Sequence, residues 1–291
     1  MMLSMETGWL RRRFDDETAI RLIKEAGFDA FDYSFYYAKD QQGKDMLCDD
    51  YLQRAYTLKE HADSLGIVCN QTHAPLDFDH ADEISLKNEN YLRNVRAIEV
   101  SSVLGAKSIV VHSVGSVLRS NLDYFDYNIN YLKSYIPYCE KYKMHISVEN
   151  LHTYDDNKNA VGIKGLTTAQ EHIDYIKKLD SEWFNICLDT GHTAVCGVEP
   201  DDMIMTIGNK LLKALHIHDT DKIKDRHWLP YSGSINWEKV TDALGKIGYD
   251  GDFTMEAINF FAGVPDELVE ASLKYACTTG RFLMNKILYN E

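Results

Sequence analysis

The segment from Lys213 to Asp221 gathers four side chains that can bind a metal ion, and they are His216, His218, Asp219 and Asp221. The first half of the segment is apolar, as expected for a short buried β-strand. Alternate residues of a strand point to the same face, so His216 and His218 would lie together. Asp225 and His227 follow in the next loop and add another carboxylate and imidazole. The pattern indicates a metal site close to the end of this strand.

Five other strand-like runs also end in a residue that can ligate a metal. In chain order these residues are His73, His112, Glu149, Asp189 and Glu256. A single histidine at such a place is more often a hydrogen-bonded core residue than a ligand. A carboxylate is harder to explain structurally, because burying it without a partner costs several kcal/mol. Glu149, Asp189 and Glu256 are therefore the stronger ligand candidates.

The elements that must position these residues alternate between strand-like and helix-like segments. Strands are predicted at 3–7, 28–35, 67–73, 108–112, 145–150 and 184–189, through His216, and at 252–256. Helices are predicted at about 15–26, 50–65, 84–104, 121–142, 167–179, 200–208, 236–247 and 265–287. Eight strand-then-helix units without a composition break predict an α/β fold, the (β/α)8 TIM barrel, with residues 1–291 as a single domain.

In such a barrel the carboxyl ends of the strands share one rim, so the residues that close the strands converge there. An open doubly wound sheet is the structural alternative. The GxGxxG pattern that usually follows its first strand is missing, and no P-loop is visible. The barrel therefore accounts better for both the element order and the placement of the polar residues.

Composition limits the partners of the protein. The chain has 45 acidic and 31 basic residues and a net charge of -14, which disfavours nucleic acid and anionic membranes as partners. Six cysteines without a CxxC pair fit reduced thiols in the cytoplasm better than a disulfide framework. Residues 1–13 have no long apolar run, so neither a signal peptide nor a membrane span is expected.

The ligand types narrow the choice of metal. Carboxylate and imidazole ligands suit Mn²⁺, Zn²⁺, Co²⁺ or Mg²⁺. The absence of cysteine from the strand ends argues against a structural zinc site. An open, catalytic divalent-metal site is therefore predicted.

Four of these strand-end motifs resemble the xylose-isomerase-like barrel superfamily of sugar isomerases, epimerases and apurinic endonucleases. The motifs are Val148-Glu149-Asn150, Leu188-Asp189-Thr190-Gly191-His192, His216-Ile217-His218-Asp219 and Thr254-Met255-Glu256. The resemblance covers essentially the whole chain. In the ketose 3-epimerase branch the matching residues bind one divalent metal, and the two glutamates act as acid and base. The resemblance thus implies Glu149, Asp189, His216 and Glu256 as metal ligands, with Glu149 and Glu256 also catalytic.

The endonuclease branch of the superfamily binds three zinc ions, and its additional ligands also have counterparts here. They are His73, His112, His192, Asp225 and His227. His218 stands where that superfamily usually has Asn or Asp. These six residues are therefore candidates for a second metal site, so that more than one ion could bind. His192 and His227 also match positions at which epimerase-like relatives contact substrate hydroxyls.

The resulting functional prediction is a metal-dependent sugar or sugar phosphate isomerase or epimerase of carbohydrate metabolism. Its mechanism would be proton transfer through an enediolate, with one glutamate removing a proton and the other returning it. The alternative is a zinc-dependent phosphodiesterase, hydrolase or lyase of the endonuclease IV-like branch. A sugar-binding or scaffold barrel without catalysis is a third reading, and the four principal ligand residues argue against it.

Two further segments each have two alternative interpretations. The run from Arg11 to Arg13 is predicted to be a solvated loop, with an anion-binding role as the alternative. The last helix carries enough apolar residues to pack either on its own barrel or on a second subunit, so a homo-oligomer is conceivable. Packing on its own barrel is the preferred expectation.

Overall fold

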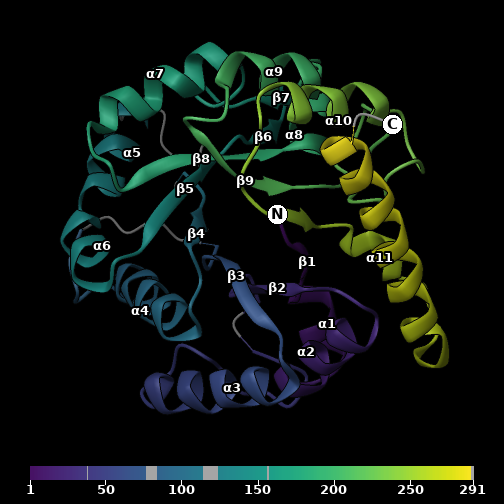
Figure 1. The fold of residues 1–291 in the computed structure, drawn as a ribbon. Coiled ribbons are helices and arrows are strands. Elements are labelled where there is room, and N and C mark those ends of the chain that lie inside the picture. The colour runs from purple at the N-terminus through teal and green to yellow at the C-terminus, as the bar shows by residue number, and fades with distance from the viewer. Residues whose placement is uncertain (38, 77–83, 114–123, 156, 290–291) are drawn as a thin grey trace.

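Eight parallel strands form a ring at the centre of this computed structural model, which describes residues 1–37, 39–76, 84–113, 124–155 and 157–289 (Figure 1). The strands are β1 (Leu3–Glu6), β2 (Ala30–Ser34), β3 (Val68–His73), β4 (Ser108–Val111), β5 (His145–Glu149), β8 (Phe184–Asp189), β9 (Leu212–His216) and β10 (Phe253–Met255). Hydrogen-bonded neighbours follow the order β10-β1-β2-β3-β4-β5-β8-β9. A parallel bridge between Ile217 and Met255 joins the two ends. The predicted barrel is confirmed.

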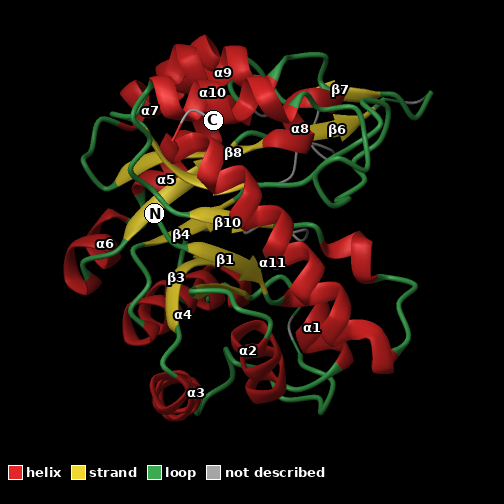
Figure 2. Cartoon of the chain, turned by 45° about the vertical axis from the view of Figure 1, so that its right-hand side comes forward, coloured by secondary structure: helices red, strands yellow, loops and turns green. Residues whose placement is uncertain are grey.

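Helices surround the ring of strands (Figures 1 and 2). They are α1 (Gly8–Arg13), α2 (Asp16–Glu25), α3 (Tyr51–Leu65), α4 (Glu89–Leu104), α5 (Tyr124–Lys133), α6 (Ile136–Tyr142), α7 (Ala169–Leu179), α8 (Thr190–Val195), α9 (Pro200–Ile207), α10 (Trp237–Lys246) and α11 (Asp266–Tyr289), with a 3-10 turn η1 (Ile258–Phe261). Within the described ranges, none of the helices combines the length and apolarity needed to span a membrane.

Side-chain caps define several helix starts. Asp15 accepts a hydrogen bond from the Thr18 amide at the start of α2, and Asn236 does the same for Lys239 at the start of α10. Helices α3 and α4 each end at a glycine in the left-handed region, Gly66 with φ 65° and Gly105 with φ 85°. The helix starts predicted at 15 and 236 and the helix ends predicted at 65 and 104 therefore coincide with caps in the structure.

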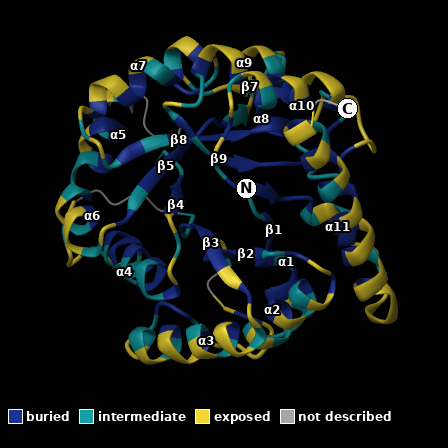
Figure 3. Ribbon diagram, in the orientation of Figure 1, coloured by how far each residue is buried: buried dark blue, intermediate teal, exposed yellow. Residues whose placement is uncertain are grey.

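The core lies inside and around the strands. Figure 3 shows most of the strand residues in the buried colour, while the outer helices expose one face. All four residues of β4 are buried, as expected for a strand covered on both sides. The buried side chains of α11, among them Leu273, Leu283 and Ile287, pack on the barrel. The preferred expectation for the last helix agrees with this packing.

Several predicted boundaries differ from the structure. The helix expected at 84–104 begins only at Glu89, and the one expected at 121–142 is two helices, because α5 ends at Lys133 and α6 begins at Ile136. Residues 121–123 of that prediction lie outside the described residues. The loop after β5 contains an unpredicted hairpin of β6 (His152–Tyr154) and β7 (Ala160–Gly162). In Figure 2 it lies on the side toward which β1 and β10 point.

The prediction that Arg11 to Arg13 form a solvated loop is wrong. These residues form the end of α1, and Arg11 is only 1% exposed. Its guanidinium pairs with Asp16, donates to the backbone oxygen of Ser34 and lies 4.4 Å from the centre of the Tyr33 ring. A buried arginine needs such partners because its charge cannot be neutralised. Arg11 therefore fixes α1 to the neighbouring strand.

Candidate metal centre

Four strand-end residues form a central cluster of Glu149, Asp189, His216 and Glu256. One potential ligand atom from each residue lies within 4.8 Å of the others. All four side chains are buried, although they come from the ends of β5, β8 and β9 and from the residue after β10. The structure therefore brings the four predicted principal ligands to one place at the carboxyl ends of the strands.

The imidazole of His216 contacts both glutamates of this cluster. Its Nδ1 lies 2.8 Å from Oε1 of Glu149 and 3.4 Å from Oε2 of Glu256. One nitrogen of the ring thus faces two carboxylates that come from opposite sides. A cation in this space would have oxygen and nitrogen donors on several sides.

A second cluster extends the first through Glu149. Oε2 of this carboxylate lies 2.7 Å from Nε2 of His112 and 3.7 Å from Nε2 of His73. The two histidine nitrogens are 3.1 Å apart and approach the same oxygen. Glu149 therefore offers one oxygen to the central cluster and the other to the pair of histidines.

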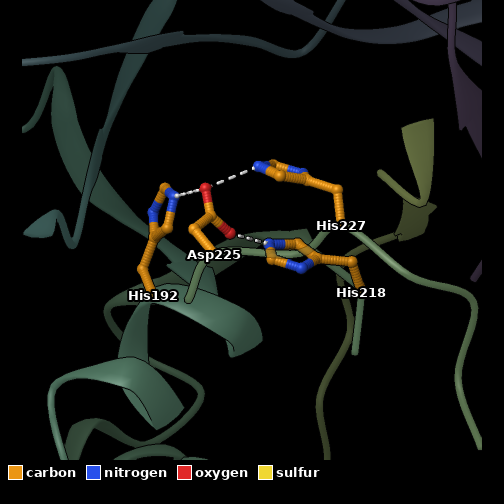
Figure 4. A group of neighbouring side chains, drawn as sticks. All are labelled: His192, His218, Asp225 and His227. Carbon is orange, nitrogen blue, oxygen red and sulfur yellow. Dashed lines mark hydrogen bonds and ion pairs between the residues drawn. The ribbon is translucent and has the colours of Figure 1, made fainter. Parts of the chain in front are cut away.

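A third cluster, shown in Figure 4, consists of His192, His218, Asp225 and His227. Oδ2 of Asp225 lies 2.8 Å from Nε2 of His227 and 3.5 Å from Nε2 of His192, and its Oδ1 lies 3.8 Å from Nε2 of His218. The rings of His218 and His227 stack with centroids 4.0 Å apart. Three imidazole nitrogens thus converge on one carboxylate.

Backbone oxygens fix the outward ring nitrogens of two histidines of the third cluster, His192 and His227. Nδ1 of His192 is 3.0 Å from the carbonyl oxygen of Asn150, and Nδ1 of His227 is 3.1 Å from that of Glu256. A bond from Nδ1–H to a carbonyl leaves Nε2 with its lone pair free, which is the arrangement that metal-binding histidines need. Both rings are therefore oriented for coordination through Nε2.

His216 and His218 do not act together as the strand pattern predicted. Strand β9 ends at His216, and His218 lies in the third cluster, with its Nε2 2.9 Å from Oδ2 of Asp189. The pairing with β10 continues past the strand through the bridge between Ile217 and Met255, and the two imidazoles belong to different clusters. Asp189 touches both groups and connects the third cluster to the centre.

Local packing explains why Gly191 lies beside His218. A Cβ atom on Gly191 would be 1.9 Å from Cε1 of the His218 ring, closer than any real contact. Helix α8 begins here, with the Asp189 side chain accepting a hydrogen bond from the His192 amide. The Asp-Thr-Gly-His motif therefore has three roles. Asp189 is a proposed ligand, Gly191 leaves room for the His218 ring, and the helix start orients His192.

Asp219 organises the loop that carries Asp225 and His227. It is fully buried and accepts hydrogen bonds from the amides of Gly233 and Ile235 and from the indole nitrogen of Trp237. The sequence analysis counted Asp219 among the side chains that can bind a metal ion. The structure shows a loop anchor instead.

The surroundings shift the pKa values of Glu149 and Glu256 in opposite directions. Burial alone would raise the pKa of Glu149, but the neighbouring His216 and His112 bring it well below its ordinary value. Burial raises the pKa of Glu256 above its ordinary value, although His216 and His227 oppose the shift. Glu149 is therefore held ionised, whereas Glu256 binds a proton more readily.

Asp225 and His227 form a charged pair. Burial would lower the pKa of His227, but Asp225 raises it to about 10. Burial would raise the pKa of Asp225, and His227 and His192 lower it instead. A divalent cation would have to displace the proton of His227 before it could bind that ring nitrogen.

Two carboxylates at the same rim were missed by the sequence analysis. Glu6 closes β1, and Asp32 lies on β2 with Oδ2 3.6 Å from Nε2 of His216. Both residues are buried. Glu6 follows the strand-end rule and could have been found by it, whereas Asp32 precedes the end of its strand by two residues and carries no such signal.

The donor atoms fit a divalent cation. Oε2 of Glu256, Oδ1 of Asp225 and Nδ1 of His218 are buried without a hydrogen-bond partner among the described residues. Buried polar atoms left unpaired are costly, and carboxylate oxygens and imidazole nitrogens are the ligands that Mn²⁺, Co²⁺ and Zn²⁺ accept. The chemistry of the clusters therefore matches the predicted type of cofactor.

Comparison with known proteins agrees with the barrel fold. An uncharacterized protein of Methanocaldococcus jannaschii is 30% identical over 169 residues, which cover 56% of this chain and 55% of that protein. A D-psicose 3-epimerase of Ruminiclostridium cellulolyticum is 24% identical over 213 residues, which cover 68% of this chain and 66% of that enzyme. The chain thus spans less than two thirds of the length of these relatives.

A crystal structure of a D-psicose 3-epimerase in the presence of D-fructose has the same fold, with a TM-score of 0.74 at 15% identity. The superposition covers 98% of this chain and 99% of that one. The family described as xylose isomerase-like TIM barrel matches residues 20–276. Because this match covers most of the chain, the protein belongs to the xylose isomerase-like TIM barrel family.

Proposed function

We propose that the protein is a divalent-metal-dependent isomerase or epimerase that acts on a sugar or a sugar phosphate, with residues 1–291 working as one domain. The observation that carries the proposal is the convergence of Glu149, Asp189, His216 and Glu256 within 4.8 Å at the rim of the barrel. Similarity to D-psicose 3-epimerases supports the same class of substrate. A small neutral or anionic carbohydrate is therefore the proposed partner.

Glu149 is the proposed base. Its lowered pKa keeps it ionised near neutral pH, so it can accept the proton from a carbon next to the substrate carbonyl. When bound, a divalent ion supplies positive charge that polarises the carbonyl. The electron pair of the broken C–H bond then moves into an enediolate.

Glu256 is the proposed acid that returns a proton. Its raised pKa, caused first by burial, makes its protonated form available. Delivery to the opposite face of the same carbon inverts that centre and makes the enzyme an epimerase. Delivery to the neighbouring carbon, together with transfer of the hydroxyl proton from one oxygen to the other, interconverts an aldose and a ketose.

The remaining candidate residues are proposed to hold further ions or substrate hydroxyls. His73 and His112 share Oε2 of Glu149, and the third cluster shares Asp189 with the centre. Ligands shared in this way allow neighbouring ions to lie close together, as in polynuclear sites. A second ion at His192, His218, Asp225 and His227 has the fuller set of donors.

The arrangement of three adjoining clusters also favours a second candidate function, a zinc-dependent hydrolase or lyase. Several zinc ions could activate a water molecule for attack on a phosphodiester. The net charge of -14 disfavours a nucleic acid substrate for such an enzyme. The number of bound ions and the chemistry they support separate the two candidates.

The test combines metal analysis with a substrate screen. Purified protein is stripped with a chelator and reloaded with Mn²⁺ or Zn²⁺, and ions per chain are counted. Ketoses, aldoses and their phosphates are then incubated with each form, and the products are separated by chromatography. We expect a sugar to be converted to its isomer or epimer only by the reloaded protein. Cleavage of model phosphodiesters without any sugar conversion would favour the hydrolase instead.

A further inference from the structure

We infer that Asp32 is a positioning residue for His216: its carboxylate faces Nε2–H of the imidazole and so presents Nδ1 to the metal. The inference rests on the proposed function of the central cluster as a metal centre. Asp32 lies on β2 and faces the ligand His216, but it is not itself one of the four proposed ligands.

The orientation of the His216 ring is the first observation. Nδ1 faces the carboxylates of Glu149 and Glu256 at 2.8 and 3.4 Å, so this nitrogen is the one directed at the central cluster. The opposite nitrogen, Nε2, lies 3.6 Å from Oδ2 of Asp32. The ring is thus held between the cluster and a carboxylate that does not belong to it.

The second observation is that each of these two side chains has a buried polar atom without a hydrogen-bond partner. Nε2 of His216 and Oδ1 of Asp32 are buried, and neither has a hydrogen-bond partner within the part of the chain that the structure describes. Both side chains are fully shielded from solvent. A shift of roughly half an ångström would bring Nε2 and the carboxylate to hydrogen-bonding distance. Burial makes that bond the available way to satisfy both groups.

Asp32 is itself held in place from the neighbouring strand. Nε2 of Gln71 donates a hydrogen bond of 2.8 Å to Oδ2 of Asp32. The pairing of β2 with β3 shifts between Phe31 and Asp32, and the shift sets Asp32 opposite Gln71. On its other side, the His216 ring stacks on His73 at an interplanar angle of 15°. The carboxylate and the imidazole therefore have little freedom to move apart.

The physical effect of such a carboxylate is known from metal sites in general. It fixes the tautomer and the orientation of the ligand imidazole and raises the basicity of the coordinating nitrogen. Without Asp32, the His216 ring could rotate, or its proton could lie on Nδ1 instead of Nε2. In either case the ion would bind less tightly. Asp32 should thus act on metal affinity through His216.

Isothermal titration of chelator-treated protein with Mn²⁺ tests the inference. We expect the dissociation constant for Asp32→Asn to rise by roughly 10–100-fold relative to wild type. Asp252→Asn is the matched control, because Asp252 is also buried but lies at the opposite end of the barrel, where it accepts hydrogen bonds from the Met2 amide and Lys107. Thermal unfolding of the metal-free proteins reports any purely structural effect.

The outcomes separate the two levels of the proposal. Wild-type protein that binds no Mn²⁺ would overturn the metal centre itself. Wild-type binding with equal affinity in Asp32→Asn would overturn only the role of Asp32, as would a loss of thermal stability without a loss of affinity. An Asp32→Glu variant, which restores the carboxylate, should recover part of the affinity.

A measurement on the unaltered protein avoids any dependence on a variant that folds poorly. In ¹⁵N-histidine-labelled protein loaded with Zn²⁺, the nitrogen signals of His216 distinguish a protonated from a metal-bound position. We expect Nε2 to carry the proton and Nδ1 to bind the ion. Coordination through Nε2 would contradict the inference, because that nitrogen could not then donate to Asp32.

Discussion

Oε1 of Glu149 lies 2.8 Å from Nδ1 of His216, although the two residues are 67 positions apart in the chain. The contact joins the end of β5 to the end of β9 across the rim of the barrel. Neither partner could be placed there by local structure alone, because only closure of the parallel sheet brings these strand ends together. The candidate chemistry of the protein follows from this closure.

Replacement of either glutamate should abolish turnover without unfolding the protein. Glu149→Gln and Glu256→Gln keep the side-chain size but remove the groups proposed to move the proton, so activity on the identified sugar should fall at least about 10²–10⁴-fold. Steady-state kinetics measure the loss, and circular dichroism checks the fold. Glu140→Gln, at an exposed position on α6, is the control. Near-normal turnover in either variant would remove that glutamate from the mechanism.

Loss of the third cluster should lower the number of bound ions. Asp225→Asn removes the carboxylate on which three imidazoles converge, so zinc content per chain should decrease relative to wild type. Elemental analysis after dialysis against Zn²⁺ makes the comparison, with His61→Ala as the control, because this half-buried histidine of α3 belongs to none of the three clusters. An unchanged zinc count in Asp225→Asn would argue that this cluster binds substrate hydroxyls instead.

A methyl group at Gly191 should disturb the same cluster through packing. The new Cβ in Gly191→Ala would overlap the His218 ring, and overpacking of this kind typically costs about 1–3 kcal/mol of stability. Urea unfolding measures the cost. Gly263→Ala is the matched control, because a Cβ there meets nothing within 4 Å. Equal stability of the two variants would show that His218 moves away freely.

Glu6 should make stability depend on pH. Burial, followed by repulsion from Glu256 and Asp32, raises its pKa from 4.5 to about 7. The folded state therefore keeps the proton that the unfolded chain releases, and stability is lost as the pH rises from about 4.5 through about 7. The loss from this group amounts to about 3 kcal/mol at higher pH.

The variant Glu6→Gln isolates that contribution. The amide stays neutral and can still accept from the Gly8 amide, so the variant should be more stable than wild type at about pH 8 and nearly equal at about pH 5. Urea unfolding of the metal-free proteins at both pH values gives the difference. A stability gain that is the same at both pH values would mean that Glu6 does not titrate as described.

The strand-end residues could be predicted because a parallel barrel converts position along each strand into position at one rim. His73, Glu149 and Asp189 therefore lie where the sequence pattern placed them. Asp32 gave no signal, since it lies within an aromatic run and its importance depends on contact with a strand far along the chain. The assignment of His216 and His218 to different clusters depends on contacts with Asp189 and Asp225, which strand periodicity does not predict.

The burial of Arg11 shows a different limit of sequence reasoning. Three consecutive arginines are typical of a solvated surface, and only tertiary contacts with Asp16 and Tyr33 draw the first of them inside. The exposed Arg12 keeps the behaviour that the pattern predicted. A run of charged residues thus predicts the average solvent exposure of its segment, but not the exposure of each residue in it.

Solvent deuterium incorporation tests the central claim most directly, because it detects removal of a carbon-bound proton even when little product accumulates. Mn²⁺-loaded protein is incubated in D₂O with ketoses, aldoses and their phosphates, and the sugars are analysed by proton NMR and mass spectrometry. We predict deuterium at the carbon next to the carbonyl of one sugar with wild-type protein, and none with Glu149→Gln or after chelation. Incorporation that persists in Glu149→Gln, or sugar conversion without any deuterium, would contradict the account.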